Sequence, residues 1–258
     1  MKAAELFDLT GQVALVTGAS SGLGVRFAQV LAENGASVAL VARRMERLDA
    51  LKARIEKNGG RAVAIAADVL DHAAMRRAFD AAEAAFGTVT ILVNNAGVTH
   101  ADRAIEIAEA EWRRVIDTNL DAVLFWAQEA ARRMIAAQKR GSIVNIASIL
   151  GFGVGKGLIA YAVAKAGVIQ LTKGLALELA FKGVRVNAIA PGYVVTEINR
   201  EYLAQKGAEI ARQIPAARLG EERDLDGALL LLASDAGRFI AGATIVVDGG
   251  QMIGLRGE

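Results

Sequence analysis

"QVALVTGASSGLG", residues 12–24, joins a short apolar run to a glycine-rich turn and then to residues that favour a helix. Its first six residues are mostly the apolar and β-branched types that fill buried strands. Glycine lets the backbone turn tightly and approach a ligand closely, and the start of a helix offers free N–H groups to a phosphate. The stretch predicts a strand, a phosphate-binding turn and a helix, although the turn alone would equally suit a purely structural role.

Six more apolar runs follow along the chain, separated by segments of helix length. They are almost continuously apolar, as expected for strands covered on both faces of a parallel sheet. This alternation predicts an α/β fold: a single doubly wound, Rossmann-type domain of about seven parallel strands with helices on both faces. The strands are expected at 12–17, 37–42, 62–67, 89–94, 142–147, 184–190 and 243–248, and the helices at 23–34, 45–58, 72–86, 111–138, 160–181 and 224–234.

The composition excludes several kinds of site. The chain has no cysteine, so disulfides, thiolate metal sites and cysteine nucleophiles are excluded. Its two histidines, His72 and His100, lie far apart in sequence, which argues against a histidine metal site or a Ser-His-Asp triad, and no metal is expected. The net charge of +2, from 30 basic and 28 acidic residues, gives no support for nucleic-acid binding.

The chain of 258 residues is 53% hydrophobic and has no proline-rich or serine-rich linker, so residues 1–258 are expected to form one domain. The N-terminus does not resemble a signal peptide. The apolar run "GALLLLASDAG" near the end is shorter than the roughly 20 residues that span a bilayer, so a cytoplasmic protein without membrane contact is expected. The segment 191–220 holds both prolines and is expected to form a substrate loop or lid.

The end of the second expected strand, "VARRMERL" (41–48), bears on the choice of cofactor. In a dinucleotide-binding fold this position meets the adenine ribose, where an NAD enzyme has a carboxylate. The chain has Ala42 instead, followed by Arg43 and Arg44, which can pair with a 2′-phosphate. The pattern favours NADP(H) over NAD(H), although both arginines would also suit the solvated start of a helix.

Taken together, the motifs resemble those of the short-chain dehydrogenases/reductases, in the branch of beta-ketoacyl-carrier-protein reductases and sugar or polyol dehydrogenases. The resemblance covers essentially the whole chain, and the motifs occur in the order and at the spacings of that family. They are "TGASSGLG" (17–24), "NNAG" (94–97), Asn119 in "IDTNLDAV", Ser148 in "VNIASILG", "YAVAK" (161–165), "NAIAPGYVVT" (187–196) and "VVDGG" (246–250).

The resemblance implies that Tyr161 is the catalytic acid and base, assisted by Ser148, Lys165 and Asn119. A free tyrosine has a pKa near 10. Residues four apart on a helix share a face, so Lys165 is expected beside Tyr161, where an ammonium about 4 Å away would lower the phenol pKa by up to about three units. Ser148 would hold the substrate oxygen, and the backbone carbonyl of Asn119 would hold a water next to Lys165.

The resemblance also implies the contacts with the dinucleotide. The glycine turn would hold the pyrophosphate, "NNAG" the ribose and the segment from Pro191 the nicotinamide. Asp68 would bind the adenine, although it would equally suit a helix N-cap, and Asn94 is expected to brace the sheet. The expected cofactor-binding residues are Gly18, Ser20, Ser21, Gly22, Leu23, Gly24, Arg43, Arg44, Asp68, Val69, Asn95, Ala96, Gly97, Tyr161, Lys165, Pro191, Gly192, Val194 and Thr196.

The function implied by the resemblance is reduction of a ketone by NADPH, with a proton supplied by Tyr161. The mostly apolar candidates for the substrate pocket suggest a small or medium apolar ketone or a beta-keto ester or thioester, with no evident arginine clamp beyond Arg200 and Arg212. These candidates are Leu150, Phe152, Val154 and Tyr193.

Two alternatives stay open at this point: an NAD-linked sugar, polyol or secondary-alcohol dehydrogenase, and a non-catalytic nucleotide-sensing protein. The family resemblance further implies a homotetramer, formed through the helices at 111–138 and 160–181 and the segment from 243 onward. Trp112 and Trp126, which lie in the first of these helices, would suit either an interface or the core.

Overall fold

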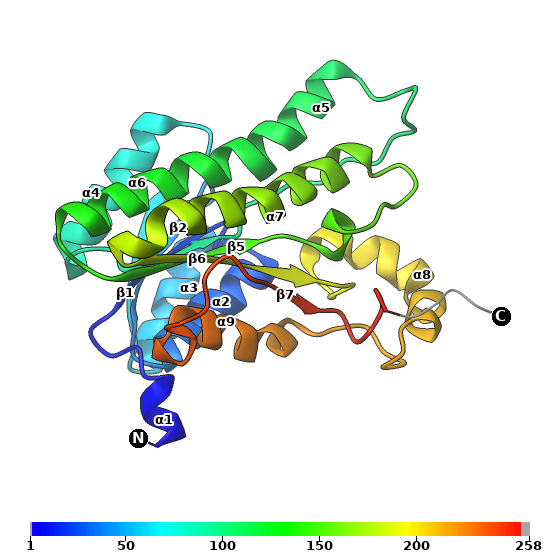
Figure 1. Ribbon diagram of the computed structural model, residues 1–258. Helices are drawn as coiled ribbons and strands as arrows, with labels where there is room; N and C mark the ends of the chain where they lie inside the picture. The colour runs from blue at the N-terminus through cyan, green and yellow to red at the C-terminus, as the bar shows by residue number, and fades with distance from the viewer. Residues whose placement is uncertain (1, 254–258) are drawn as a thin grey trace.

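The computed structural model describes residues 2–253, in which seven strands form one parallel sheet (Figure 1). The order across the sheet is β3-β2-β1-β4-β5-β6-β7, so the chain starts in the middle, builds one half and then returns to build the other. The predicted doubly wound sheet is confirmed. Its strands are β1 Val13–Thr17, β2 Ser37–Ala42, β3 Arg61–Ala66, β4 Ile91–Asn94, β5 Gly141–Ile146, β6 Val184–Pro191 and β7 Thr244–Val247.

The apolar runs become strands because the middle of the sheet is covered on both faces. Every residue of β1, β2 and β4 is buried, whereas the edge strand β3 mixes buried and exposed positions. Ala14 of β1 pairs with Val38 of β2 and with Ile91 of β4, so the three strands run in register. Their carboxyl ends therefore meet at one edge of the sheet, where such folds bind ligands.

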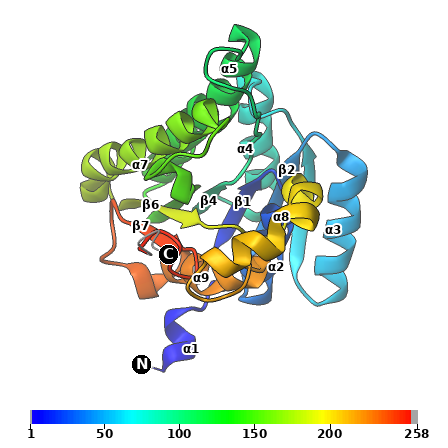
Figure 2. The ribbon, with the colours of Figure 1, turned by 90° about the vertical axis from the view of Figure 1, so that its right-hand side faces the viewer.

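One face of the sheet is covered by α2 (Gly22–Glu33), α3 (Met45–Lys57) and α9 (Asp226–Ala233) (Figures 1 and 2). Leucines and a phenylalanine of these helices pack on the sheet in one apolar cluster that includes Phe27, Leu51 and Leu229. Arg26 of α2 also reaches α9, where its Nε lies 3.0 Å from Asp226 Oδ1. Helices from the two ends of the chain are thus held together on this face.

The opposite face is covered by α4 (His72–Phe86), α6 (Ala122–Ala136) and α7 (Ile159–Leu179). Phe79, Trp126 and Met134 form the centre of a second apolar cluster beneath α4 and α6. Trp126 is only 1% exposed, so it is a core residue. Helices on both faces were expected from the sequence, and this expectation is confirmed.

The prediction of a single helix at 111–138 is wrong in detail. The segment consists of α5 (Glu109–Ile116), a π-helical turn at Asp117–Asp121 and α6. A π turn inserts one extra residue into the helical repeat, and such turns frequently occur at functional sites. Asn119, which the sequence singled out, lies inside this turn and is completely buried.

The carboxyl edge of the sheet carries α8 (Arg200–Gln213), which faces the viewer in Figure 2. It belongs to the segment 191–220, for which closure over a substrate stays a prediction. No helix among residues 2–253 is long and apolar enough to cross a membrane. The remaining short helices are α1 Ala3–Leu6 and the 3₁₀ turns Ile149–Gly151, Ala180–Lys182, Glu197–Asn199, Glu222–Leu225 and Asp235–Gly237.

Candidate active site

The turn between β1 and α2 is shaped by close approaches at its glycines. Gly18 has a φ of +68°, and a Cβ at this position would lie 2.8 Å from the Cα of Ala96. A Cβ on Gly24 would overlap the carbonyl oxygen of Gly18. Side chains are therefore excluded at both positions, and the turn presents backbone and the N-terminus of α2, which attracts anions.

The segment after β4 holds this turn in place. The hydroxyl oxygen of Thr17 accepts from the backbone N–H groups of Asn95 and Ala96, at 3.0 and 3.1 Å. The side-chain amide of Asn95 donates to the Thr17 carbonyl at 3.0 Å. Asn95 also lines the cavity, so its amide braces the glycine turn while its expected contact with a ribose stays a prediction.

Arg44 extends from the end of β2 across the glycine turn. Its Nη2 donates to the hydroxyl oxygens of Ser20 and Ser21, at 3.0 and 3.1 Å. The neighbouring Arg43 has a side chain that is 75% exposed and reaches Asp68 only loosely, at 3.8 Å. One guanidinium and two hydroxyls thus form a small cluster that can bind a phosphate.

The loop after β3 forms another wall. Asp68 Oδ1 accepts from the backbone N–H of Leu70 at 3.1 Å. The N-cap of α4 is Asp71, which accepts from the N–H groups of Ala73 and Ala74, at 2.8 and 3.0 Å. Asp68 is therefore not the helix cap, and its second carboxylate oxygen lies 3.8 Å from Arg43 Nη1.

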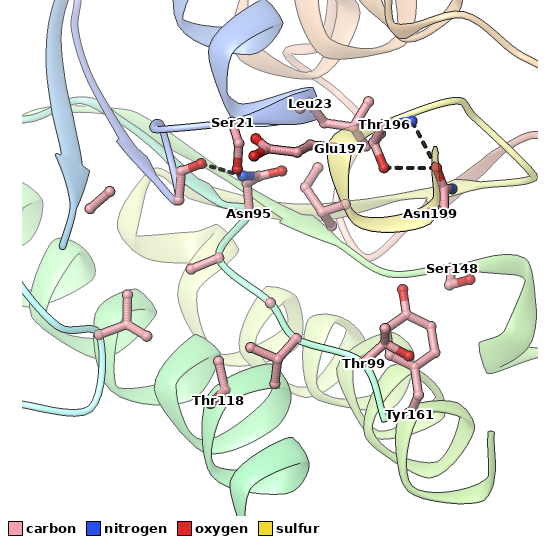
Figure 3. A pocket seen from close by; sticks show the side chains of 18 of the residues that line it. Ser21, Leu23, Asn95, Thr99, Thr118, Ser148, Tyr161, Thr196, Glu197 and Asn199 are labelled. Carbon is pink, nitrogen blue, oxygen red and sulfur yellow. Dashed lines mark hydrogen bonds between the residues drawn. The ribbon is translucent and has the colours of Figure 1, made fainter. Parts of the chain in front are cut away.

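The Tyr161 hydroxyl lies beside Ser148 in the cavity (Figure 3), and the two side chains share a hydrogen bond. Ser148 follows β5 and caps the 3₁₀ turn, where its oxygen accepts from the Leu150 N–H at 3.1 Å. Tyr161 comes from the first turn of α7. Burial raises the pKa of the Tyr161 phenol above its ordinary value of 10.0, and a hydrogen bond from Ser148 opposes that rise.

Lys165 lies one turn further along α7 and is 4% exposed. Its Nζ donates to the carbonyl of Ile146 at 2.6 Å and lies 5.5 Å from the centroid of the Tyr161 ring. Burial lowers the pKa of Lys165 from 10.5 to about 8. The predicted lowering of the Tyr161 pKa is wrong in direction, because burial of the phenol outweighs its hydrogen bond with Ser148, and the Lys165 ammonium donates to a backbone carbonyl rather than to the phenol.

Asn119 contacts the cavity only indirectly. Its side chain accepts from the N–H of Val98 at 2.8 Å and donates to the Val98 carbonyl at 2.7 Å. Val98 itself lines the cavity, so Asn119 fixes the strand extension that passes over the site.

The segment after β6 is fixed by its own hydrogen bonds. The Thr196 hydroxyl donates to Asn199 Oδ1 at 3.1 Å, and the Asn199 amide donates to the Val194 carbonyl at 2.8 Å (Figure 3). The N–H of Gly192 donates to the Val247 carbonyl at 2.9 Å. Val194 and Thr196 thus occupy defined positions at the cavity wall.

A buried chain of polar side chains ties the strands that carry the site to α7. The amide of Asn94 donates to Asn145 Oδ1 at 3.0 Å, and the amide of Asn145 donates to the Thr172 hydroxyl at the same distance. All three side chains are at most 3% exposed. Asn94 therefore braces the sheet, as the sequence suggested.

One cavity of about 490 Å³ brings these groups together. Its lining includes every expected cofactor-binding residue except Gly24, whose place is under the turn. Ser148, Tyr161 and Lys165 line it, as do Leu150 and Tyr193, whereas Asn119, Phe152 and Val154 do not. No group of three or more acidic, histidine or cysteine side chains suited to a metal is found within residues 2–253.

A family model described as short chain dehydrogenase matches residues 12–207. The chain belongs to the short-chain dehydrogenase family. It is an oxidoreductase, and the resemblance inferred from its motifs is confirmed.

Relatives of this short-chain dehydrogenase carry names that differ in substrate. The 3-oxoacyl-(acyl-carrier-protein) reductase FabG of Staphylococcus aureus is 40% identical over 239 residues, covering 92% of this chain and 97% of that protein. Gluconate 5-dehydrogenase of Gluconobacter oxydans is 37% identical over 253 residues, covering 97% and 98%. A crystal structure of a gluconate 5-dehydrogenase from Burkholderia cenocepacia in complex with NADP and tartrate has a TM-score of 0.94 at 37% identity, covering 98% and 100%.

Five polar residues that line the cavity of this short-chain dehydrogenase were not singled out from its sequence. They are Thr99, Arg114, Thr118, Glu197 and Asn199. Arg114 donates through Nη2 to the Thr99 carbonyl at 3.3 Å and pairs with Glu111 at 2.7 Å. Neither arginine proposed for a substrate clamp, Arg200 or Arg212, lines the cavity. The signal available was that these residues lie within or a few residues from the family motifs in the sequence.

Proposed function

We propose that this short-chain dehydrogenase reduces a ketone to a secondary alcohol with NADPH. The observation that supports this best is that the Ser148 and Tyr161 side chains lie together, within hydrogen-bond reach, in the cavity that also contains the glycine turn and Arg44. A carbonyl oxygen between two hydroxyl donors accepts hydrogen bonds from both, and these bonds strengthen as charge develops on it.

The residues present fit a dinucleotide. Gly18 and Gly24 leave no space for a side chain between the turn and its surroundings, so backbone can meet a pyrophosphate at the start of α2. Asp68 and Val69 would hold the adenine at one end of the cavity, and the segment from Pro191 to Thr196 the nicotinamide at the other. When bound, the reduced nicotinamide supplies the hydride that reaches the carbonyl carbon.

Ser148 and Tyr161 would divide the work on the substrate oxygen. Ser148 Oγ accepts from the Leu150 N–H, and its proton can turn from Tyr161 to the substrate oxygen. Because burial raises the Tyr161 pKa, the phenol keeps its proton at neutral pH and can give it to the oxygen of the developing alcohol. A protonated phenol suits reduction better than the reverse reaction.

Lys165 would return the proton to Tyr161. An amine with a pKa of about 8 exchanges protons close to neutral pH, and the bond to Ile146 holds it beneath the ring. By analogy with the family, Lys165 would also bind the nicotinamide ribose. The backbone carbonyl of Asn119, in the π turn, would hold a water that connects Lys165 to solvent.

The preference for NADP(H) rests on the cluster around Arg44. Its guanidinium and the hydroxyls of Ser20 and Ser21 suit a 2′-phosphate, and Ala42 offers no carboxylate to a ribose hydroxyl. Arg43 is exposed enough to join once a phosphate is present. The relative from Burkholderia cenocepacia binds NADP, which agrees with this proposal.

The substrate is proposed to be a small or medium apolar ketone or a beta-keto ester or thioester. Leu150 and Tyr193 line the cavity with Ser148, and the chain is similar to a 3-oxoacyl reductase. A second candidate is a sugar acid or another polyol. Arg114 in the lining and the similarity to gluconate 5-dehydrogenase favour it, because a guanidinium binds a carboxylate.

We also propose a cytoplasmic homotetramer. The outer faces of α6 and α7 expose Phe125, Val163 and Leu177, the last of them 83% exposed, and such large apolar side chains are typical of buried interfaces. Near the carboxyl end, Phe239 is fully exposed and Ile253 is 85% exposed. These two groups would form two different interfaces, and sedimentation of the purified chain would give its mass directly.

A turnover screen with one variant tests the proposal. Ethyl acetoacetate, acetoacetyl thioesters and 5-ketogluconate would each be offered with NADPH and with NADH, and absorbance at the nicotinamide band followed. Tyr161→Phe should lose at least about a hundredfold in turnover while NADPH binding stays nearly unchanged. Full turnover by Tyr161→Phe would refute the assignment. NADPH binding without reduction of any ketone would favour the nucleotide-sensing alternative.

A further inference from the structure

The loop between β3 and α4 is a wall of the cavity that is supported from behind by α6. Ala67, Asp68, Val69 and Leu70 line the cavity. The loop is short, because α4 already begins at His72. Its shape therefore depends on what touches it from the side away from the cavity.

Two consecutive side chains of α6 contact this loop and the first residue of α4. The indole N–H of Trp126 donates to the Val69 carbonyl at 3.0 Å. The ring of Phe125 packs edge-on against His72, with 4.6 Å between the ring centroids. Trp126 does not line the cavity. It contacts the loop from the core, where its ring packs against Phe79 of α4.

These contacts hold the peptide group between Val69 and Leu70 at both ends. Its carbonyl accepts from Trp126, and its N–H donates to Asp68 Oδ1 at 3.1 Å. The peptide plane fixes the direction of the Val69 side chain and of the second Asp68 oxygen, which faces Arg43. Loss of the indole bond would leave this plane freer to rotate, because no second donor to the Val69 carbonyl is found within residues 2–253.

The helix that carries Trp126 has its own anchor to α4. Arg133 of α6 pairs with Asp80 at 2.7 Å and with Glu83 at 2.8 Å. The two helices therefore stay together if the indole bond is lost. The position of the loop can therefore change without a change in the packing of α4 against α6.

We propose that Trp126 is a positioning residue for the adenosine end of the dinucleotide, acting through Val69 without touching the ligand. The proposal rests on the proposed function in so far as the cavity binds a dinucleotide. Under this proposal a core residue contributes to the binding of the adenosine half of the cofactor and not to the binding of the nicotinamide half.

The test measures the two halves of the ligand separately. Calorimetric titrations with 2′,5′-ADP, reduced nicotinamide mononucleotide and NADPH would compare wild type with Trp126→Phe, which keeps an aromatic ring beside Phe79 but loses the N–H donor and part of the indole volume. We expect the dissociation constants of 2′,5′-ADP and NADPH to rise about fivefold, the effect of one hydrogen bond, and that of the mononucleotide to stay within error. Trp112→Phe, in the partly buried α5, is the matched control and should change none of them.

Fluorescence gives an independent readout that needs no change at Trp126. In Trp112→Phe the remaining tryptophan is Trp126, and its emission should shift on addition of 2′,5′-ADP but not of the mononucleotide. Three outcomes would each overturn the proposal. They are an equal loss of affinity for 2′,5′-ADP and the mononucleotide in Trp126→Phe, an unchanged affinity of that variant for 2′,5′-ADP, and a Trp126 emission that does not change when 2′,5′-ADP is added. Wild type that fails to bind 2′,5′-ADP would overturn the proposed function as well, whereas the three preceding outcomes leave that function intact.

Discussion

The ammonium of Lys165 lies 5.5 Å from the centroid of the Tyr161 ring, yet it donates its short hydrogen bond to the carbonyl of Ile146. A buried cation loses its hydration, and one hydrogen bond to a backbone carbonyl replaces only part of the lost interaction with water. The result is a lysine with a pKa of about 8 beside a tyrosine whose pKa is raised. Both groups are thus held near the protonation states that a proton relay in the reductive direction needs.

The first prediction is that Lys165 makes the fold less stable below about pH 8 than the same fold with an uncharged side chain there. The folded state loses this proton near pH 8 and the unfolded state near 10.5, so unfolding takes up a proton between these values and stability rises with pH. The full penalty, present below pH 8, is about 3 kcal/mol. Lys165→Met should therefore be more stable than wild type at pH 7, although loss of the hydrogen bond to Ile146 reduces the gain. The difference in the free energy of unfolding should shrink toward pH 10.

Urea unfolding of wild type and Lys165→Met at several pH values between 7 and 10 measures this difference. Lys139→Met is the control, because Lys139 is exposed and should show no such trend. A gap between Lys165→Met and wild type that does not narrow as the pH rises would contradict the lowered pKa.

The second prediction concerns Arg44 and the 2′-phosphate. Arg44→Gln removes the positive charge of the guanidinium that donates to Ser20 and Ser21. A charge-assisted hydrogen bond contributes about 1.5–3 kcal/mol. We expect NADPH to bind about ten- to a hundredfold more weakly while NADH binding changes little. Fluorescence titration with both nucleotides measures the ratio, and Arg54→Gln, on the exposed side of α3, is the control. Equal losses for NADPH and NADH would show that Arg44 acts elsewhere.

The third prediction compares two glycines. A Cβ on Gly24 would overlap the Gly18 carbonyl and lie 2.6 Å from the Asn95 amide, so Gly24→Ala must shift the glycine turn. We expect a loss of about 1–3 kcal/mol in stability together with weaker NADPH binding. Gly227 in α9 has nothing within 4 Å of its Cβ position, so Gly227→Ala should be neutral or stabilising by up to about 1 kcal/mol. Chemical unfolding and nucleotide titration of both variants measure the difference between the two positions. A Gly24→Ala protein that binds NADPH normally would contradict the prediction.

The sheet was predictable because its signal is local. Runs such as 37–42 are apolar on both faces since the strand is buried on both, and β2 has the expected limits. The site followed from the same pattern, because parallel strands bring their carboxyl ends to one edge. Ser148 after β5 and Asp68 after β3 reach the same cavity for that reason.

Features that depend on distant contacts were not predictable. Nothing in the residues around Asn119 distinguishes a π turn from an ordinary helix. The sign of the Tyr161 pKa shift depends on burial by surrounding elements, which helical spacing alone does not report. Arg114 and Glu197 enter the cavity lining from α5 and the 3₁₀ turn after β6, at places fixed by tertiary packing. Spacing identified the reacting groups but not their electrostatic surroundings.

The last prediction concerns an ion pair between α3 and a residue that lines the cavity. Arg47 Nη1 of α3 lies 2.7 Å from Glu197 Oε2, at the start of the segment expected to form the lid. Arg47 lowers the pKa of the Glu197 carboxyl, so a full negative charge lines a cavity proposed to bind phosphates. Arg47→Gln leaves that charge without its partner and should weaken NADPH binding a few-fold at low salt, an effect that high salt screens. Since the harm comes from the carboxylate, adding Glu197→Gln should restore the affinity. Titrations of the two single variants and the double variant measure this, and a double variant as weak as Arg47→Gln would mean that Arg47 itself binds the nucleotide.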